Sequence, residues 1–278
     1  MSMSIGRRRF PAFEIVMLVA GLAFISPLAL VLINSFKDLP QIIASPLALP
    51  RPVCWQNYRD IFTTVDLARP MFNSFLMAAA VIACLVILGP MAAYALERRR
   101  MPGRKALRAF FLSGLVIPFQ VIMVPLLQEF RMIHIEFTYL SLLLVYVSCG
   151  LPLCIFIYSG FMSTIPRSLE EAAAIDGCGP FRTFWHVVYP LLMPCTITIV
   201  IFWGLWIWND FMAAFVFMGQ DRAQLAFVQL WSFLNDQYVK NWNTIFAGVV
   251  VLSAPVTILY LLMQRRFIKG LTAGAVKE

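Results

Sequence analysis

The chain has 278 residues, of which 61% are hydrophobic and only 13% carry a charged side chain. Typical soluble domains carry about 25% charged residues, so this composition, with a mean hydropathy of +0.80, excludes an ordinary soluble protein. The formal net charge of +8 does not indicate nucleic-acid binding, because the basic residues gather in short segments between apolar runs.

Six apolar runs reach the roughly 20 residues that a helix needs to cross a bilayer. In chain order they lie at about residues 13–36, 71–96, 109–130, 139–162, 191–218 and 244–263. None alternates apolar and polar residues as the strands of a membrane barrel do. We therefore predict an all-α, polytopic membrane protein with six transmembrane helices. Three arginines precede the first run, but it is too long for the apolar core of a signal peptide, so we expect it to be retained.

The distribution of positive charge predicts the orientation of these spans. Of the 22 lysines and arginines, 15 lie on the side that holds both chain ends and 7 lie on the other side. Because cytoplasmic segments carry the excess of Lys and Arg, residues 1–12 and 264–278 are predicted to be cytoplasmic. The first loop, 37–70, is then extracytoplasmic, and residues 71–263 form a five-helix core. The basic excess is also favourable for contact with anionic lipid in the bilayer.

The outer loops are too short to form a separate domain, so any soluble substrate-capturing domain would be another polypeptide. In the longest loop, the prolines of "ASPLALPRP" favour extended chain. The following "WQNYRDIF" is expected to form a short helix with Trp55, Tyr58 and Phe62 toward the lipid headgroups. No metal site is predicted, because the chain has no CxxC and His134 and His186 fall on opposite sides of the membrane.

A polar stretch, "SLEEAAAIDGCGPFRTFWHVVYPLLMP", interrupts the apolar sequence at residues 168–194. Ser168 and Glu171 have the spacing of a capping box, which predicts a helix over residues 169–175. Gly177 is expected to end this helix with a positive φ. Pro180 is expected to begin a second helix, and Pro190 to bend the chain into the fifth span.

The second helix of this hairpin is predicted to place four apolar side chains on one face, namely Phe181, Phe184, Trp185 and Val188. In the first helix, Ala172 and Ala173 leave one face thin, which allows another surface to approach. A simple connection between helices needs only a few residues, whereas the loop spans about residues 164–190. The residues alone leave two interpretations open: a hairpin that only links two spans, or a docking element for another protein.

This stretch resembles the cytoplasmic motif of ABC importer permeases, at Glu171, Ala172, Ala173, Gly177, Val187 and Pro190. "DGCGPF", which begins at Asp176, and "VVYPLLMP" are similar to the carbohydrate-uptake, maltose-importer-like branch in particular. Cys178 and Tyr189 are mild departures, since that branch commonly has alanine and leucine there. Three further stretches are also similar to this branch: "NSF" at residues 73–75, "WND" at 208–210 and "GLTAGAVKE" at 270–278. The likeness therefore covers nearly the whole chain.

The resemblance implies a type I ABC importer permease fold in a bacterial cytoplasmic (inner) membrane. The partners that it implies are a second homologous permease subunit, two ATP-binding subunits and an extracytoplasmic substrate-binding protein. It further implies that the hairpin, with Asp176 among its residues, couples to an ATPase subunit. For the tail at 270–278 it favours order against these subunits over the alternative of a frayed chain end. The chain contains no GxxxxGK[ST] phosphate-binding loop, so we expect no enzyme activity and no cofactor here, with ATP and Mg bound by the partners.

Polar and aromatic residues in the membrane suggest a substrate path without deciding it. Indole faces stack on sugars and polar groups bond hydroxyls, and one stripe of the fifth span carries Trp203, Trp206, Asn209 and Asp210. These four residues could instead form an aromatic belt or pack between helices. Gln120 in the third span is a further candidate for the path, and its alternative role is a hydrogen bond between helices.

The predicted cargo is a sugar or oligosaccharide, moved by alternating access. A polyol or a glycerol-phosphate compound stays open as an alternative cargo. A secondary transporter is less favoured, because it predicts buried charges and inverted repeats. A membrane enzyme would need a nucleophile–base or metal constellation, which the residues do not offer.

Overall fold

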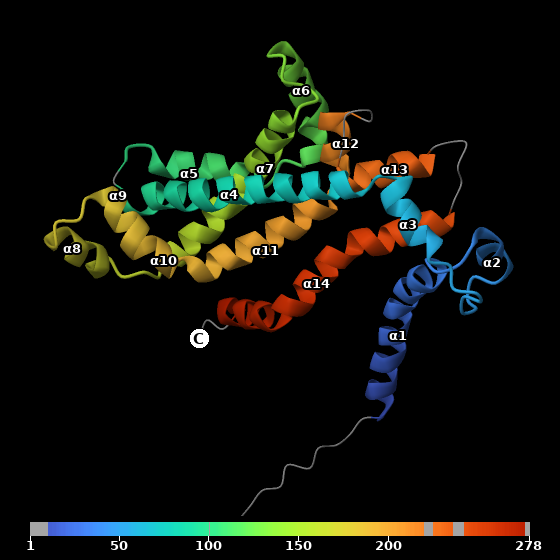
Figure 1. Cartoon of the computed structure of the whole chain (residues 1–278). Helices are drawn as coiled ribbons and strands as arrows, with labels where there is room; N and C mark the ends of the chain where they lie inside the picture. The colour runs from blue at the N-terminus through green and yellow to red at the C-terminus, as the bar shows by residue number, and fades with distance from the viewer. Residues whose placement is uncertain (1–10, 100, 220–224, 236–241, 276–278) are drawn as a thin grey trace, which may run out of the picture. The chain divides into compact units, whose positions relative to one another are not determined.

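The computed structural model describes residues 11–99, 101–219, 225–235 and 242–275, and Figure 1 follows them along the chain. The regular structure in these residues is helical, as predicted, with no β-strand among them. In chain order the elements are α1 (Pro11–Asn34), α2 (Leu39–Ala44), α3 (Gln56–Thr63), α4 (Ala68–Arg98), α5 (Arg104–Ser113), α6 (Phe119–Met132), α7 (Tyr139–Met162), α8 (Ser168–Ile175), α9 (Pro180–Thr183), the π-helical segment η1 (Phe184–Val188), α10 (Tyr189–Leu191), α11 (Met193–Asn209), α12 (Met212–Met218), α13 (Ala226–Asn235) and α14 (Trp242–Ala275).

Within the described residues, four helices are long and apolar enough to cross a membrane. They are Phe13–Asn34 in α1, all of α4, all of α7, and Trp242–Leu261 in α14. A fifth candidate is the pair Pro180–Leu191 and Met193–Asn209, which meet at an angle of 73°. These helices confirm a polytopic helical membrane protein, while the count of six stays a prediction.

The third predicted span, residues 109–130, is not one continuous helix, so the prediction of a single helix there is wrong. Helix α5 ends at Ser113 and α6 begins at Phe119. Pro118, in extended conformation with ψ of 126°, lies directly before α6. A proline disfavours the helical conformation in the residue before it, and at this point the apolar run breaks into two helices.

The last two predicted spans also differ from the structure at their ends. The fifth, at 191–218, consists of α11 and α12 with an interruption at Asp210 and Phe211. The sixth was expected to end at residue 263, whereas α14 continues to Ala275. Residues 1–10, with the three arginines of the predicted cytoplasmic N-terminus, and residues 276–278 of the tail lie outside the described residues.

The chain divides into two compact units. One comprises residues 1–66 and 233–254, and the other comprises residues 67–232 and 255–278, so that the division falls within α14 before Pro255. In the first unit, α3 confirms the predicted short helix, and Trp55 and Phe62 are exposed. The outward placement of Tyr58 was wrong. Its ring packs on Phe36, and its hydroxyl lies 2.7 Å from the hydroxyl of Ser35.

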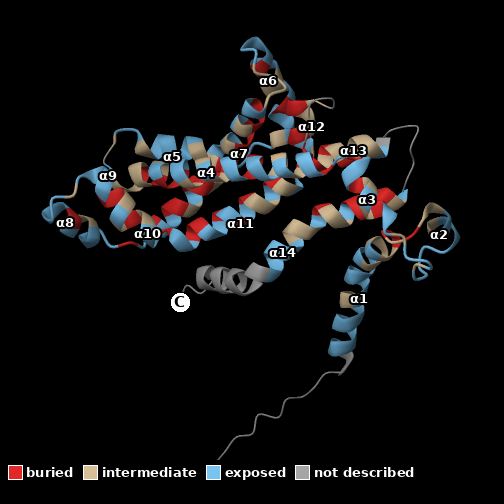
Figure 2. Cartoon of the chain, viewed as in Figure 1, coloured by how far each residue is buried: buried red, intermediate tan, exposed pale blue. Residues whose placement is uncertain are grey.

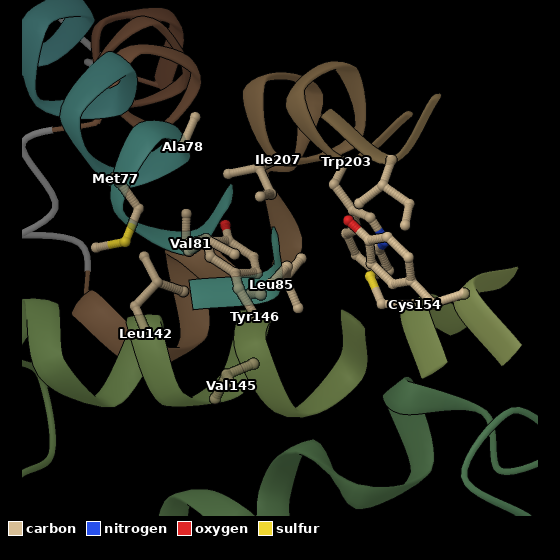
Figure 3. Close-up of a cluster of buried hydrophobic side chains, with 14 of the residues drawn as sticks. Met77, Ala78, Val81, Leu85, Leu142, Val145, Tyr146, Cys154, Trp203 and Ile207 are labelled. Atoms are coloured by element: carbon tan, nitrogen blue, oxygen red, sulfur yellow. The ribbon is translucent and has the colours of Figure 1, made fainter. Parts of the chain in front are cut away.

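The core of the second unit forms where α4 packs along α7 and α11 crosses them. Figure 3 shows the apolar side chains that meet there, and Figure 2 shows the buried residues that run along these helices. The labelled set comprises Met77, Ala78, Val81 and Leu85 of α4, Leu142, Val145, Tyr146 and Cys154 of α7, and Trp203 and Ile207 of α11. This packing fixes the positions of the helix ends on which the candidate site is built.

Two glycines allow α4 and α7 to approach closely. A Cβ added to Gly89 of α4 would lie 3.0 Å from the Cβ of Cys154, and one added to Gly150 of α7 would lie 2.8 Å from both methyl carbons of Leu85. Leu85 is fully buried in the hydrophobic core, so it can move aside only by displacing other packed side chains. Small residues at such contacts are typical of membrane helix pairs, in which packing replaces the hydrophobic effect as the force between helices.

We therefore expect Gly150→Val to destabilise the protein by about 1–3 kcal/mol, the usual range for overpacking. Gly160→Val on the same helix is the matched control, because an added Cβ meets no atom within 4 Å there. Thermal unfolding in detergent checks this, with a lowered melting temperature for the first variant only. Equal melting temperatures for both variants would contradict the close approach of α4 and α7.

Candidate functional site

The polar hairpin begins with the eight-residue helix α8, whose C-terminal end has the predicted geometry. Gly177 has a φ of +80°, which confirms the sequence prediction. The N–H of Cys178 donates to the carbonyl of Ala173 at 2.9 Å, and the N–H of Gly177 donates to that of Ala174 at 3.1 Å. These two bonds form a Schellman motif, in which a left-handed residue, usually glycine, ends the helix.

The N-terminal end of α8 does not form the predicted capping box. The helix begins at Ser168, and the residue before it, Arg167, makes no side-chain capping bond. The carbonyl of Arg167 instead accepts the N–H groups of Glu170 and Glu171, at 2.9 and 3.0 Å. Ser168 thus lies one position too late in the chain to act as the cap.

The inner face of α8 is fixed by Glu170, a residue that the sequence analysis missed. Its Oε1 forms an ion pair with Nε of Arg98 at 2.7 Å, and 9% of the Arg98 side chain and 16% of the Glu170 side chain are exposed. The hydroxyl of Tyr94 donates to Oε2 of Glu170 at 2.9 Å. Both partners belong to the last turns of α4, so α8 is fastened to the end of that helix.

Arg98 also connects α7 to this cluster. Its Nη2 donates to the carbonyl of Met162, the last residue of α7, at 3.0 Å and to that of Ile165 at 2.7 Å. The final carbonyls of a helix have no partner within the helix, and one guanidinium supplies it here. The ring of Tyr94 packs in turn on Phe184 at 5.1 Å between centroids. We call Tyr94, Arg98 and Glu170 the anchor cluster.

The outer face of α8 is free for contact. Ala173 is buried, whereas Glu171, Ala172, Asp176 and Gly177 are exposed. Leu169 is 42% exposed and Ile175 is 87% exposed. Leu169, Ala172 and Ile175 follow one another at spacings of three, so they lie on one side of the helix. The result is a small apolar surface bordered by the two acids.

The second arm of the hairpin departs from a regular helix. Pro180 begins α9, as predicted, and Phe184 and Val188 are buried, but Phe181 is 70% exposed. The difference arises at η1, whose π-helical turn changes the register of the helix face. Of the motif residues in this arm, Val187 is half-buried and Pro190 is exposed, and the chain bends by 73° at Leu192 to enter α11.

The predicted substrate-path residues are brought together only in part. Trp203 is buried in the core, with its ring 5.1 Å from that of Trp206. An open hollow of about 650 Å³ is lined by Trp206, Asn209 and Asp210 of the predicted set, with Phe202, Leu205, Phe211 and Met212. Gln120 is exposed on α6 and is not among the residues that line this hollow.

Asp210 also has a structural task. Its Oδ2 accepts hydrogen bonds from the hydroxyl of Tyr146 at 2.9 Å and from the N–H groups of Ala213 and Ala214 at 3.0 and 3.2 Å. These bonds cap the start of α12 and fasten the interruption of the fifth predicted span to α7. In Asn209, by contrast, the amide donates to the carbonyl of Leu205 in its own helix at 2.7 Å.

The model of a protein family, described as binding-protein-dependent transport system inner membrane component, matches residues 85–273. This range includes the anchor cluster, the hairpin and the hollow. The chain belongs to this family. Membership confirms the resemblance on which the sequence analysis rested, and it identifies the chain as a permease component of a membrane transport system.

Curated relatives of this permease match over nearly their full length. It is 34% identical over 261 residues, 94% of each chain, to the probable starch degradation products transport system permease protein AmyC of Thermoanaerobacterium thermosulfurigenes. It is 32% identical over 273 residues to the melibiose/raffinose/stachyose import permease protein MelC of Bacillus subtilis, covering 97% of this chain and 98% of that one.

A solved structure confirms the fold. The permease matches a chain of a bacterial ABC transporter involved in the import of the acidic polysaccharide alginate with a TM-score of 0.80 and 20% identity, over 95% of this chain and 99% of the other. The architecture is therefore that of an ABC importer permease.

We predict that Glu170→Gln destabilises the permease by about 1–3 kcal/mol, the usual cost of leaving a partner of a buried hydrogen bond unsatisfied. The change removes the negative charge that faces Arg98. Glu171→Gln is the matched control on the exposed face and should stay within about 0.5 kcal/mol of the wild type. Thermal unfolding of both variants in the same detergent measures the difference. A Glu171 variant that loses as much stability as the Glu170 variant would show that the anchor cluster has no special role.

Proposed function

We propose that this permease is one membrane-spanning subunit of an ATP-driven importer that moves a sugar or oligosaccharide by alternating access. The observation that carries the proposal is the two-sided helix α8. Its inner side is fixed by Glu170 to the end of α4, and its outer side presents Leu169, Ala172 and Ile175. A helix that only linked two spans would not need a buried ion pair on one side and an exposed apolar surface on the other.

The outer side of α8 docks, in this proposal, into a cleft of an ATP-binding subunit. Ile175, with 87% of its surface exposed, is the apolar anchor, because a protruding aliphatic side chain loses its water contact when it enters a pocket. Ala172 allows close approach, and Glu171 and Asp176 border the contact. ATP and Mg are bound by that partner subunit, which supplies the phosphate-binding loop that this sequence lacks.

The anchor cluster then transmits movement from α8 to the membrane helices. A displacement of α8 by its partner pulls on Arg98, which is the last residue of α4 and donates hydrogen bonds to the C-terminal end of α7. Because α4 and α7 are closely packed along their length, they respond as one rigid body. Rigid-body movement of packed helices is a common form of switching in proteins.

The proposed cargo follows from the relatives and fits the hollow. Two relatives are named for the transport of starch degradation products and of the sugars melibiose, raffinose and stachyose. The hollow of about 650 Å³ combines the indole of Trp206 with the polar groups of Asn209 and Asp210. Aromatic faces and polar groups together recognise the apolar faces and hydroxyls of a sugar.

The complete importer, in this proposal, contains a second homologous permease subunit, two ATP-binding subunits and an extracytoplasmic substrate-binding protein. Both chain ends and α8 face the cytoplasm, as the distribution of lysine and arginine predicts. This orientation places the loop at residues 37–66 on the outer side, where the binding protein delivers its cargo.

Gly177→Val tests the coupling role of α8. Valine tolerates a φ of +80° poorly, so the end of α8 should be displaced, and sugar transport and sugar-stimulated ATPase activity of the reconstituted complex should fall at least tenfold. Gly179→Val is the matched control, because Gly179 has a φ of −70° and an added Cβ meets no atom within 4 Å.

The two variants must insert into the membrane in equal amounts for the comparison to hold. Normal transport by the Gly177 variant would contradict the proposed coupling. A complex whose ATPase activity responds to a polyol or a glycerol-phosphate compound, and to no sugar, would retain the coupling and overturn the proposed cargo.

A further inference from the structure

The loop that follows α1 has polar residues inside and apolar residues outside. Ser35, Lys37 and Asn57 are each no more than 1% exposed. Ile43, Leu47 and Leu49 are 74%, 75% and 67% exposed. This is the reverse of the arrangement that water imposes on a protein, in which apolar side chains gain by burial and charged ones are rarely buried. All of these residues belong to the same compact unit.

The polar interior is satisfied by hydrogen bonds within the loop. The Lys37 ammonium donates to Oδ1 of Asn34 at 3.0 Å and to the carbonyls of Ser45 and Pro46 at 2.9 and 3.0 Å. An ammonium has three N–H groups, so each has an acceptor. Burial lowers the pKa of Lys37.

Asn57 of α3 forms hydrogen bonds with backbone groups in the same interior. Its amide donates to the carbonyls of Ser35 and Lys37, both at 2.8 Å, and its Oδ1 accepts from the amide of Asn243 at 2.6 Å. The polar groups at the centre of this loop therefore have protein partners in place of water.

The exterior of the loop is almost free of charge. Residues 39–55 read "LPQIIASPLALPRPVCW", in which Arg51 is the single charged side chain. Four of these residues are prolines, which have no backbone N–H to satisfy. Val53 and Trp55 add to the exposed apolar surface, with 47% and 68% of their surface accessible. Tryptophan is enriched where membrane and water meet, and a long arginine side chain can reach the headgroups from there.

The length of α1 places this loop at the membrane boundary. The apolar part of α1, Phe13–Asn34, has 22 residues, which span about 33 Å at the rise of an α-helix. The hydrocarbon core of a bilayer is about 30 Å thick. In the described residues none of the most apolar stretch of α1 is buried, and Figure 2 shows the exposed helix leading into α2. The apolar exterior of the loop therefore continues the exposed apolar surface of α1.

We infer that residues 39–55 form an interfacial anchor that rests on the phospholipid bilayer at the C-terminal end of α1, with Ile43, Leu47, Leu49 and Trp55 among the acyl chains. Lipid is favoured over a protein partner because the apolar side chains follow directly on an exposed apolar helix that is long enough to span a bilayer. It is also favoured because the interior needs no water. The inference requires only that α1 spans the membrane, and it does not depend on the proposed cargo or coupling.

A spin label at Leu47 tests the anchor in the intact transporter. The label is attached to a genetically encoded ketone amino acid, which leaves the native cysteines in place. The complex is reconstituted in vesicles of phosphatidylethanolamine and phosphatidylglycerol at three to one. Collision rates are then measured with oxygen, which concentrates in lipid, and with a water-soluble nickel chelate.

The anchor predicts that oxygen collides more often than nickel at Leu47, with a ratio above one. The control is a label at Arg59, which is exposed on α3 in the same unit, where the ratio should fall below one. A nickel-accessible label at Leu47 would overturn the inference. A label at Leu47 that neither oxygen nor nickel reaches would also overturn it. The same holds if the purified binding protein protects the label from collisions, because either result places a protein on this surface.

Discussion

The ion pair between Arg98 and Glu170 places two opposite charges where water scarcely reaches them. Such a pair is stable only if the remaining hydrogen-bonding groups of both partners are also satisfied. Tyr94 provides this for Glu170, and the carbonyls at the end of α7 provide it for Arg98. The three elements that meet at this point cannot separate without exposing a buried charge, and the position of α8 depends on that constraint.

The constraint gives α8 two different faces. The side with Glu170 and Ala173 faces the end of α4, and the side with Leu169 and Ile175 is exposed and available to a binding partner. Gly177 then ends α8, and the chain turns into α9. The hairpin therefore consists of two short helices joined by a tight turn. In the core, Gly89 and Gly150 allow α4 and α7 to approach closely. In the proposed coupling, a force on this short, firmly attached helix reaches two closely packed helices.

The sequence predicted features that depend on local chemistry. Gly177 has a positive φ that few other residues favour, and proline is common at the first position of a helix, so the end of α8 and the start of α9 could be placed without tertiary information. The long apolar runs likewise predicted α1, α4 and α7. The proline at residue 118 was visible as well, but its effect depends on whether neighbouring helices can satisfy the freed backbone groups. The break between α5 and α6 was therefore missed.

Features that depend on long-range contacts could not be predicted. Arg98 was one of 15 basic residues that indicated the orientation, and nothing in its local sequence points to Glu170, which lies 72 positions later. The one available signal is that Glu170 and Ala173 are three residues apart and share the buried face. The interior position of Lys37 was missed for a different reason, since two of its three acceptors are the backbone carbonyls of Ser45 and Pro46, and every residue has a carbonyl. The π-helical turn at η1 also has no local signature.

Site-specific photo-crosslinking from Ile175 tests most directly whether α8 docks on an ATP-binding subunit. Benzoylphenylalanine replaces Ile175 in the intact complex, which is irradiated while it hydrolyses ATP, and the adduct is identified by mass spectrometry. The account predicts an adduct with the ATP-binding subunit, and none with that subunit from Ile43 in the loop after α1. Adducts from Ile175 with lipid or with the second permease alone would contradict the account.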